Sequence, residues 1–279
     1  MFDSVGIVGV GLLGASLGLS LKQRALCERV IGFGRRKESL DIAQSMGAID
    51  EAHLEWKDVL GSVDLLVVCV PVDKIASTVV AATPLLPPGA VVTDVGSTKS
   101  ALLARIEKEL GAETRFVGSH PLAGSEKSGP GAAQADLFDE RVCVMTPTDR
   151  TPDDVLATVR TLWEAVGMRL HAMSPQRHDE ILARTSHLPH VAAAALMGVV
   201  EDGDLPFAAG GLRDTTRIAA SAPELWRAIL MENADAVDSV LADYVGRLNE
   251  FRVALSRGDA ATLERLYRDG KRRRDTLGH

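Results

Sequence analysis

Cysteine and long apolar runs are scarce in this sequence of 279 residues. The three cysteines, Cys27, Cys69 and Cys143, are far apart and odd in number, which argues against a disulfide framework or a zinc site. The apolar stretches end well short of the ~20 residues needed to cross a bilayer, so we expect no transmembrane helix. The chain starts MFDSVGIVGVG, without a basic leader or cleavage signal, and we therefore expect a cytoplasmic protein.

Positive charge is also in deficit. The chain has 31 Lys and Arg against 38 Asp and Glu, a net charge of −7. We therefore expect no nucleic-acid partner, and the basic run at residues 271–274 is interpreted as a solvated helix end. Any anionic ligand must be bound by local groups.

The length predicts two domains, and the hydrophobic pattern divides the chain in two. Up to about residue 172, short apolar runs typical of buried parallel strands alternate with helical spacing. The expected strands are at 5–10, 30–33, 65–70, 90–93, 115–117 and 142–145, and the expected helices at 12–26, 40–47, 73–83 and 99–110. Residues 173–279 show helical spacing alone. The pattern therefore predicts an α/β domain over residues 1–172, followed by an all-α helical domain.

The helical half has two marked segments. Ser174 can cap a helix with Pro175 in its first turn. A second long helix is expected over about residues 223–255, with apolar residues at three- and four-residue steps. The seam consists of Val237, Val240, Leu241, Tyr244, Leu248, Phe251 and Leu255. It predicts a homodimer built on the helical domain; burial within the chain's own bundle is the alternative.

A glycine-rich motif, Gly9-Val10-Gly11-Leu12-Leu13-Gly14, lies between the first expected strand and helix. In a β-α-β context, Gly9 permits a tight turn, Gly11 lets the backbone approach a pyrophosphate, and Gly14 lets helix and strand pack closely. The helix N-terminus, at Leu12 and Leu13, then faces the phosphates. The motif predicts a Rossmann-type doubly wound parallel sheet that binds a dinucleotide; a glycine turn without a ligand is the alternative.

Two arginines follow the second expected strand, in Gly34-Arg35-Arg36. NAD-preferring sites usually place an Asp or Glu there for the ribose hydroxyls, whereas a guanidinium can bind a 2′-phosphate. The chemistry of Arg35 and Arg36 therefore favours NADP over NAD. The alternative is that both arginines are merely solvated.

Two further polar segments follow expected strands. The first is Asp94-Val95-Gly96-Ser97-Thr98-Lys99, in which Ser97 or Thr98 is expected to cap the next helix. Ser97 would also face the nicotinamide end of a dinucleotide. The second, residues 118–129, is expected to be a loop outside the core because it is rich in Gly, Ser and Pro. It contains His120, Glu126 and Lys127, and His120 is suited to be a general base near neutral pH.

These segments, together with residues 185–190 (TSHLPH) and 210–219 (GGLRDTTRIA), resemble the prephenate and arogenate dehydrogenases. The resemblance covers nearly the whole chain, in the same order. It implies oxidative decarboxylation of prephenate to 4-hydroxyphenylpyruvate with hydride transfer to NAD(P), in tyrosine biosynthesis, or of arogenate directly to tyrosine.

The resemblance also implies roles for individual residues. His120 takes the proton of the substrate's ring hydroxyl, and Ser97 hydrogen-bonds near that hydroxyl and the nicotinamide. His190 helps to position the substrate, and Arg217 binds one of its carboxylates. Glu126 and Trp226 match positions near the pocket.

The residues support part of this independently. His187 and His190 are three apart on a helix and share a face, but they lack the third ligand of a zinc site, so no metal is expected. Pro189 should kink that helix. Arg217 is suited to bind a carboxylate in two-point geometry, and its alternative role is an interdomain salt bridge.

Two other functions are weighed against this one. β-Hydroxyacid dehydrogenases and imine reductases also join a dinucleotide domain to a helical one, but they commonly use a lysine in the helical domain. This chain has no lysine between Lys127 and Lys271. A non-catalytic dinucleotide sensor would keep the glycine motif and would not need His120 and Arg217.

Overall fold

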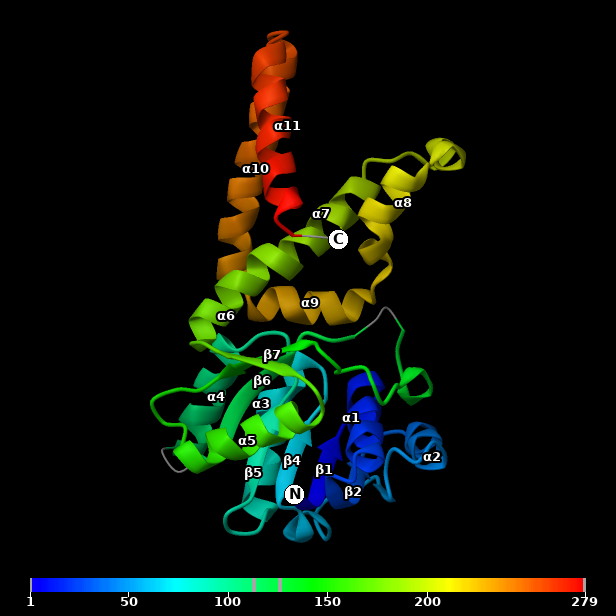
Figure 1. Cartoon of the computed structure of the whole chain (residues 1–279), viewed down its shortest axis with the longest axis vertical. Helices are drawn as coiled ribbons and strands as arrows, with labels where there is room; N and C mark the ends of the chain where they lie inside the picture. The colour runs from blue at the N-terminus through cyan, green and yellow to red at the C-terminus, as the bar shows by residue number, and fades with distance from the viewer. Residues whose placement is uncertain (1, 112–113, 125–126, 278–279) are drawn as a thin grey trace. The chain divides into compact units, whose positions relative to one another are not determined.

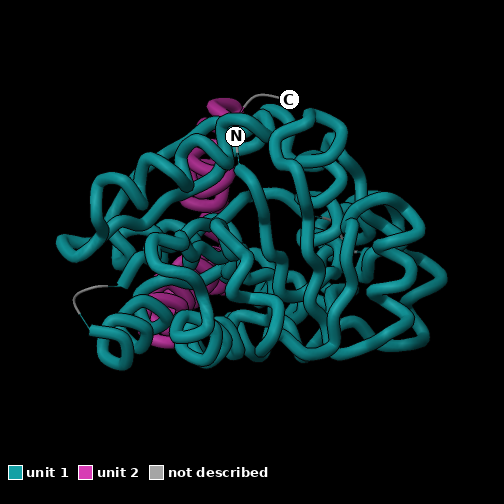
Figure 2. The backbone as a smooth tube through the Cα atoms, turned by 90° about the horizontal axis from the view of Figure 1, so that it is seen from below, with its two compact units in different colours: residues 1–233 teal, residues 234–279 magenta. Residues whose placement is uncertain are grey.

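The computed structural model describes residues 2–111, 114–124 and 127–277. The chain divides into two compact units, residues 1–233 and residues 234–279 (Figure 2). The first unit contains the sheet and all residues of the candidate site. The second is a helical hairpin.

The first unit is built on one eight-stranded sheet (Figure 1). The strands are β1 (Phe2–Val8), β2 (Cys27–Phe33), β3 (Glu51–His53), β4 (Leu65–Val68), β5 (Val91–Asp94), β6 (Phe116–Pro121), β7 (Val142–Thr146) and β8 (Arg169–Ala172). Their spatial order is β3-β2-β1-β4-β5-β6-β7-β8, and all neighbours are parallel except β6 and β7. The predicted doubly wound sheet is therefore confirmed.

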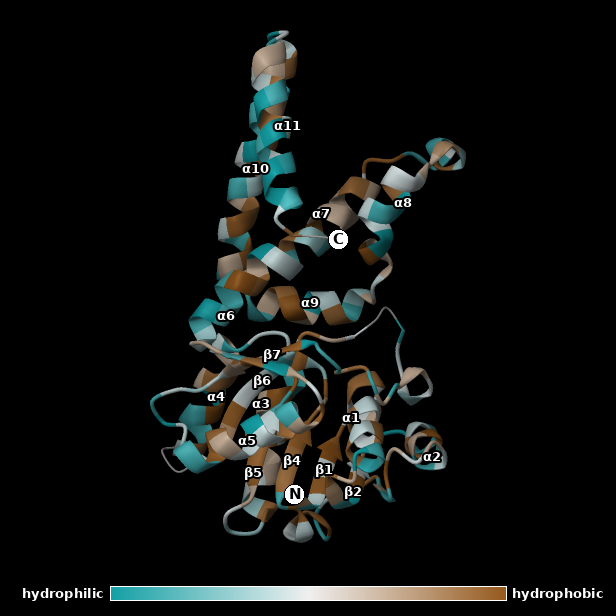
Figure 3. Ribbon diagram, in the orientation of Figure 1, coloured by the Kyte–Doolittle hydropathy of each residue, from teal (hydrophilic) through white to brown (hydrophobic). Residues whose placement is uncertain are grey.

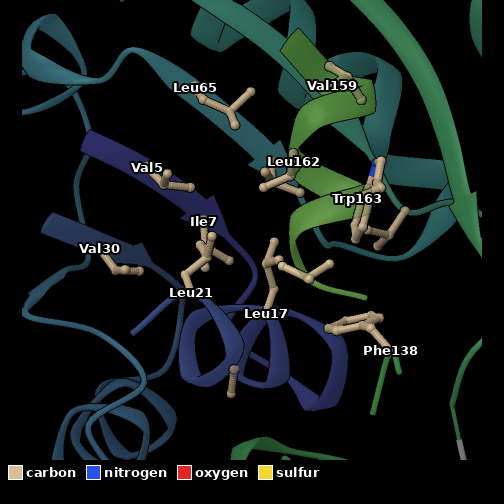
Figure 4. Packing of buried hydrophobic residues seen from close by; sticks show 14 of the residues in the cluster. Val5, Ile7, Leu17, Leu21, Val30, Leu65, Phe138, Val159, Leu162 and Trp163 are labelled. Atoms are coloured by element: carbon tan, nitrogen blue, oxygen red, sulfur yellow. The ribbon is translucent and has the colours of Figure 1, made fainter. Parts of the chain in front are cut away.

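Helices cover both faces of the sheet, and the strand sequences explain why. In β4, Leu65 and Val67 join one buried apolar cluster, whereas Leu66 and Val68 join another. Because successive side chains of a strand point to opposite faces, a continuous apolar run needs cover on both sides. The first cluster includes α1 (Leu12–Gln23), α2 (Lys37–Ser45) and α5 (Asp153–Ala165), as Figure 4 shows in part. The second includes α3 (Val72–Ala82) and α4 (Ser100–Leu110).

The chain is helical after β8, as predicted. Ser174 caps α6, with its Oγ 3.2 Å from the donating N–H of Arg177, and Pro175 lies in the first turn. The first unit holds α6 (Pro175–Leu182), a π-helical segment (Ala183–His187), α7 (Leu188–Met197), α8 (Gly210–Thr216) and α9 (Pro223–Glu232). The second holds α10 (Ala234–Ser256) and α11 (Ala260–Asp275). Short 3₁₀ turns occur at Leu60–Ser62, Thr83–Leu85, Pro130–Ala132, Asp202–Phe207 and Arg217–Ala220.

The single long helix expected over residues 223–255 is wrong. The chain forms α9 and α10 instead, because Asn233 adopts φ −125° and ψ 33°, outside the helical region. The side-chain amide of the buried Asn233 donates to the carbonyl oxygen of Asp179 at 2.9 Å. A long-range hydrogen bond thus holds the residue at which the helical pattern breaks.

The apolar seam of α10 is only partly covered by the residues that the structure describes. Val237 and Val240 are buried, and the ring of Phe251 packs edge-on against Tyr267 of α11. Leu248 and Leu255, by contrast, are 49% and 65% exposed. Figure 3 shows apolar residues on α10 and a mostly hydrophilic α11. Within the described parts of the chain, no helix is both long and apolar enough to cross a membrane.

Candidate active site

The glycine turn after β1 has the geometry that its sequence predicts. Gly9 has φ +96°, and a Cβ added to it would lie 2.5 Å from the carbonyl oxygen of Cys69. A Cβ on Gly14 would lie 2.3 Å from the carbonyl oxygen of Gly9. At Gly11, in contrast, a Cβ would meet no heavy atom within 4 Å among the residues described. The fold itself requires Gly9 and Gly14, whereas Gly11 leaves space beside the turn.

Helix α1 begins beside that space. Its first residue is Leu12, followed by Leu13, and its cap residue, Gly11, has no side chain to hydrogen-bond the N–H groups of the first turn. That turn also has no acidic residue. Free N–H groups and the positive end of the helix dipole attract an anion. The turn therefore fits the pyrophosphate of a dinucleotide.

The arginines after β2 lie at the same edge of the sheet. β2 ends at Phe33, and the N–H of Gly34 donates to the carbonyl oxygen of His53 at the end of β3. Arg35 and Arg36 follow and are exposed, with Arg36 in the cap position of α2. Carboxyl ends of neighbouring parallel strands meet at one edge, so Arg35 and Arg36 follow β2 at the edge of the sheet at which β1 ends in the glycine turn.

A buried ion pair connects the segments that carry Ser97 and His120. The Nζ of Lys99 lies 2.6 Å from Oδ2 of Asp94, and both side chains are fully buried. Lys99 also donates to the carbonyl oxygen of Gly96 at 2.7 Å. Asp94 accepts from the N–H of Gly96 at 2.7 Å and from that of Ser119 at 3.1 Å. The pair thus ties the end of β5 to the start of α4 and to β6.

The expected capping of α4 by Ser97 or Thr98 is wrong. The first N–H groups of this helix, those of Lys99 and Ser100, donate to the carboxylate of Asp179 at 2.9 and 2.8 Å. A side chain from α6, 79 residues further along the chain than Ser100, therefore caps α4. Ser97 is left half-buried in the loop between β5 and α4, at the carboxyl edge of the sheet.

The surroundings of His120 also differ from the expectation. Residues 118–121 were expected to start a loop outside the core, but they continue β6 and are buried. The reason is the antiparallel partner: β6 pairs with β7, with His120 opposite Val144. Glu126 lies outside the described residues.

His120 starts a chain of hydrogen bonds that the sequence did not indicate. Its Nδ1 lies 2.8 Å from Nε2 of His178, and Nδ1 of His178 lies 2.8 Å from Oδ1 of Asp179. The two imidazoles meet edge to face, with ring centroids 5.1 Å apart. The only sequence signal was a His-Asp pair in the first turns of an expected helix, which is too common to single out a site.

Burial keeps these imidazoles neutral. Burial, followed by the nearby His178, Lys99 and His187, lowers the pKa of His120 well below 6.5. Burial also lowers the pKa of His178, although Asp179 opposes this effect. For His187, burial lowers the pKa to about 4. A neutral His120 at physiological pH is able to accept a proton.

The second group of predicted residues gathers around Trp226 of α9. The ring of His190 stacks on Trp226 with centroids 3.6 Å apart, and His187 meets the same indole edge-on at 6.1 Å. The predicted common face of His187 and His190 is confirmed. Pro189 lies inside a helical run that is continuous from α6 through the π-helical segment into α7, so its missing N–H leaves a gap in the hydrogen-bond pattern of this run. The π-helical turn just before it is the local distortion of the helix at this proline.

Arg217 belongs to this group as well. Burial lowers the pKa of His190, a hydrogen bond with the backbone of Ile218 opposes this shift, and the charge of Arg217 adds to it. Arg217 is exposed at the start of its 3₁₀ turn. The arrangement places a cation and an aromatic pair beside one another.

Comparisons with known proteins agree over the whole chain. The family described as "Prephenate dehydrogenase, nucleotide-binding domain" matches residues 17–172, and "Prephenate dehydrogenase, dimerization domain" matches residues 174–269. A cyclohexadienyl dehydrogenase of Zymomonas mobilis is 33% identical over 284 residues, 99% of this chain and 97% of that protein.

Two solved structures are similar throughout. The first is a prephenate dehydrogenase from A. aeolicus in complex with hydroxyphenyl propionate and NAD+, with a TM-score of 0.91, 33% identity and 98% coverage of each chain. The second is an arogenate dehydrogenase from Synechocystis, with a TM-score of 0.83, 32% identity and coverage of 98% of this chain and 99% of that one.

Proposed function

This chain belongs to the prephenate dehydrogenase family, and we propose that it oxidises and decarboxylates prephenate to 4-hydroxyphenylpyruvate, the dehydrogenase step of tyrosine biosynthesis. The observation that carries the proposal is the buried imidazole of His120 at the carboxyl end of β6, where burial lowers its pKa well below 6.5. It lies on the edge of the sheet at which β1 ends in the dinucleotide turn.

The proposed reaction needs a proton acceptor, a hydride acceptor and a group that binds a substrate carboxylate. His120 takes the proton of the substrate hydroxyl, and Ser97 donates a hydrogen bond near it. A bound nicotinamide would accept the hydride from the same carbon. The electron-poor ring then loses CO₂ and becomes aromatic, which makes the step effectively irreversible. Arg217 binds a substrate carboxylate, His190 orients the ring system from its stack on Trp226, and Glu126 contributes near the pocket.

The first test is an initial-rate assay at the absorbance of the reduced nicotinamide. Prephenate and arogenate are each offered NAD and NADP in all four combinations. Turnover of prephenate with either cofactor would support the proposal. Turnover of arogenate alone would replace it with the second candidate, which the likeness to the Synechocystis arogenate dehydrogenase favours. No turnover in any combination would refute both.

The cofactor choice forms a separate proposal. Arg35 and Arg36 stand where an NAD-preferring site offers a carboxylate, so the chain is proposed to use NADP in preference to NAD. Replacing both by Ala should raise the Kd for NADP by about tenfold or more and leave the Kd for NAD within about threefold. Equal changes for the two cofactors would contradict the preference.

The helical part from residue 173 is proposed to bind substrate and to form a homodimer. Leu248 and Leu255 of α10 are exposed although they continue an apolar seam, and the matching family region is described as a dimerization domain. Light scattering at micromolar concentration should give the dimer mass. Leu248→Lys should shift the mass towards the monomer, whereas Arg252→Lys, on the same helix, serves as the control. A monomeric wild type would refute this proposal.

A variant of His120 distinguishes the proposed enzyme from a non-catalytic dinucleotide sensor. His120→Ala should lower kcat by about 10²–10⁴-fold and leave the dinucleotide Kd unchanged, because general-base catalysis contributes about that much. Unchanged turnover in this variant would refute the role of His120 as the base. A β-hydroxyacid dehydrogenase mechanism is disfavoured by the absence of lysine from residues 128–270.

A further inference from the structure

The hydrogen-bond chain behind His120 has only one consistent arrangement of protons. It begins at Asp179, whose Oδ1 accepts from the N–H of Lys99 and whose Oδ2 accepts from that of Ser100. Burial acts to raise the pKa of Asp179, but the hydrogen bonds from His178 and Ser100 outweigh it and lower the pKa. Asp179 is therefore ionised, and an ionised carboxylate only accepts hydrogen bonds.

The protonation of the two imidazoles follows from this. Because Asp179 only accepts, Nδ1 of His178 must carry the hydrogen in the 2.8 Å contact with Oδ1. In a neutral imidazole the other nitrogen is then an acceptor, so Nε2 of His178 accepts from Nδ1 of His120, also at 2.8 Å. The remaining nitrogen of His120, Nε2, holds the lone pair.

We propose that His178 and Asp179 are positioning residues that fix His120 in the tautomer whose Nε2 receives the substrate proton. This inference rests on the proposed role of His120 as the base. Once protonated, His120 donates from Nδ1 to His178, which donates in turn to the Asp179 carboxylate. The negative charge therefore stabilises the imidazolium through one intervening ring, without itself taking the proton.

The other charged groups around His120 increase the need for such a carboxylate. Lys99, at the start of α4, and His187, from the π-helical segment, both disfavour a positive charge on His120. Asp94 of β5 is paired with Lys99 at 2.6 Å. Asp179 of α6 contacts His178 directly, so its charge is the one coupled to His120 by hydrogen bonds.

Asp179, at the end of the chain of hydrogen bonds, is held in place by several elements. Its two oxygens are held by α4, whereas its own helix, α6, carries His178 one residue earlier. Its backbone carbonyl accepts from Asn233, whose amide also lies 3.1 Å from Nδ1 of His187. The position of the His120–His178–Asp179 hydrogen-bond chain is thus set by α4, α6 and Asn233, which lies between α9 and α10.

The first test reads the tautomer directly in the wild-type protein. Long-range ¹H–¹⁵N spectra of histidine-labelled protein at pH 7.5 distinguish a protonated Nδ1 from a protonated Nε2, and the spectrum of His120→Gln assigns the signal. The expected result is a neutral His120 with its hydrogen on Nδ1. A hydrogen on Nε2 would overturn the proposal. This readout needs neither substrate nor cofactor, so it stands or falls separately from the proposed function.

The second test is kinetic. In Asp179→Asn, one carboxylate oxygen becomes an NH₂ group, which faces a hydrogen-bond donor in either orientation. If the NH₂ faces His178, it donates to Nδ1 and inverts the tautomers of the imidazoles. If it faces away, the side chain carries no charge that could stabilise the imidazolium. We expect kcat to fall by about 10²–10³-fold, with KM for prephenate within about threefold and a larger solvent isotope effect on kcat. The matched control is Asp50→Asn, which alters a carboxylate that accepts from the N–H of Val30 at 2.8 Å, far along the chain from the site. A kcat within threefold of wild type in folded Asp179→Asn would refute the positioning role.

Discussion

The two halves of the candidate site are built in opposite ways. The half proposed to bind the dinucleotide, the dinucleotide half, depends on missing side chains within six consecutive residues: at Gly9 and Gly14 an added Cβ would meet backbone at 2.5 and 2.3 Å. The half proposed to act on the substrate, the substrate half, contains buried charged and polar side chains from separate elements: Asp94, Lys99, His120, His178, Asp179 and His187. The dinucleotide half is a local motif that can be recognised in the sequence. The substrate half forms only when the chain has folded.

The comparison also shows in which half a substitution lowers the free energy of unfolding most. Omitting a side chain costs little once the turn has formed, but a buried charge depends on its partner. Lys99 is among the largest fully buried side chains of the described structure, and its Nζ has Asp94 and the Gly96 carbonyl as partners. The substrate half should therefore be the less tolerant of substitution.

The largest expected effect comes from breaking this pair. Lys99→Met should lower the free energy of unfolding by about 3–5 kcal/mol, because it leaves the carboxylate of Asp94 buried without its cation. Urea unfolding at pH 7.5 measures the change. The double variant Asp94→Asn/Lys99→Met should recover a large part of the loss, since neither charge remains. A single variant as stable as wild type would show that the pair does not stabilise the junction of β5 with α4 and β6.

How far the sequence predicts the molecule follows the same division. The strands β1, β2, β4, β5 and β7, the glycine turn and the cap at Ser174 were predictable because each is encoded within a few residues. The strands β3 and β8 were not, because Glu51–His53 and Arg169–Ala172 lack an apolar run and are strands through pairing with β2 and β7. His120 lies in a strand for the same reason.

The candidate site divides likewise. Resemblance and residue chemistry led to Ser97, His120, His190 and Arg217, but not to His178 or Asp179. The cap of α4 was assigned to a neighbour in sequence, whereas Asp179 provides it from 79 residues beyond Ser100. No local rule carries that information, because the capping side chain is chosen by the packing of α6 against α4.

A smaller effect is expected from acid, again in the substrate half. The pKa of His187 is about 4 in the folded chain and near 6.5 when unfolded, so below pH 6.5 the unfolded state binds a proton that the folded state does not. Stability is therefore unaffected above pH 6.5 and is lost as the pH falls towards 4. This residue's share should be about 2 kcal/mol at pH 5.

Urea midpoints at pH 7.5, 6.0 and 5.0 test this expectation, with His187→Gln as the comparison. The variant should lose less stability between pH 7.5 and 5.0 than the wild type. His171→Gln is the matched control, because His171 lies on the exposed strand β8. Parallel pH profiles for wild type and His187→Gln would mean that His187 does not titrate as its burial requires.

The smallest effect is expected in the dinucleotide half, and it separates the two kinds of glycine found there. Gly11→Ala should change the free energy of unfolding by less than about 1 kcal/mol, because the new Cβ meets nothing within 4 Å among the described residues and Gly11 has φ −94°, which alanine tolerates. The dinucleotide Kd should nevertheless rise about tenfold, because the methyl group occupies the space beside the turn.

Gly14→Ala, whose Cβ would lie 2.3 Å from the Gly9 carbonyl oxygen, should instead lower the Tm. Thermal unfolding and fluorescence titration of both variants decide the matter: if Gly11→Ala binds the dinucleotide as well as wild type, the open space beside Gly11 is not where the pyrophosphate lies.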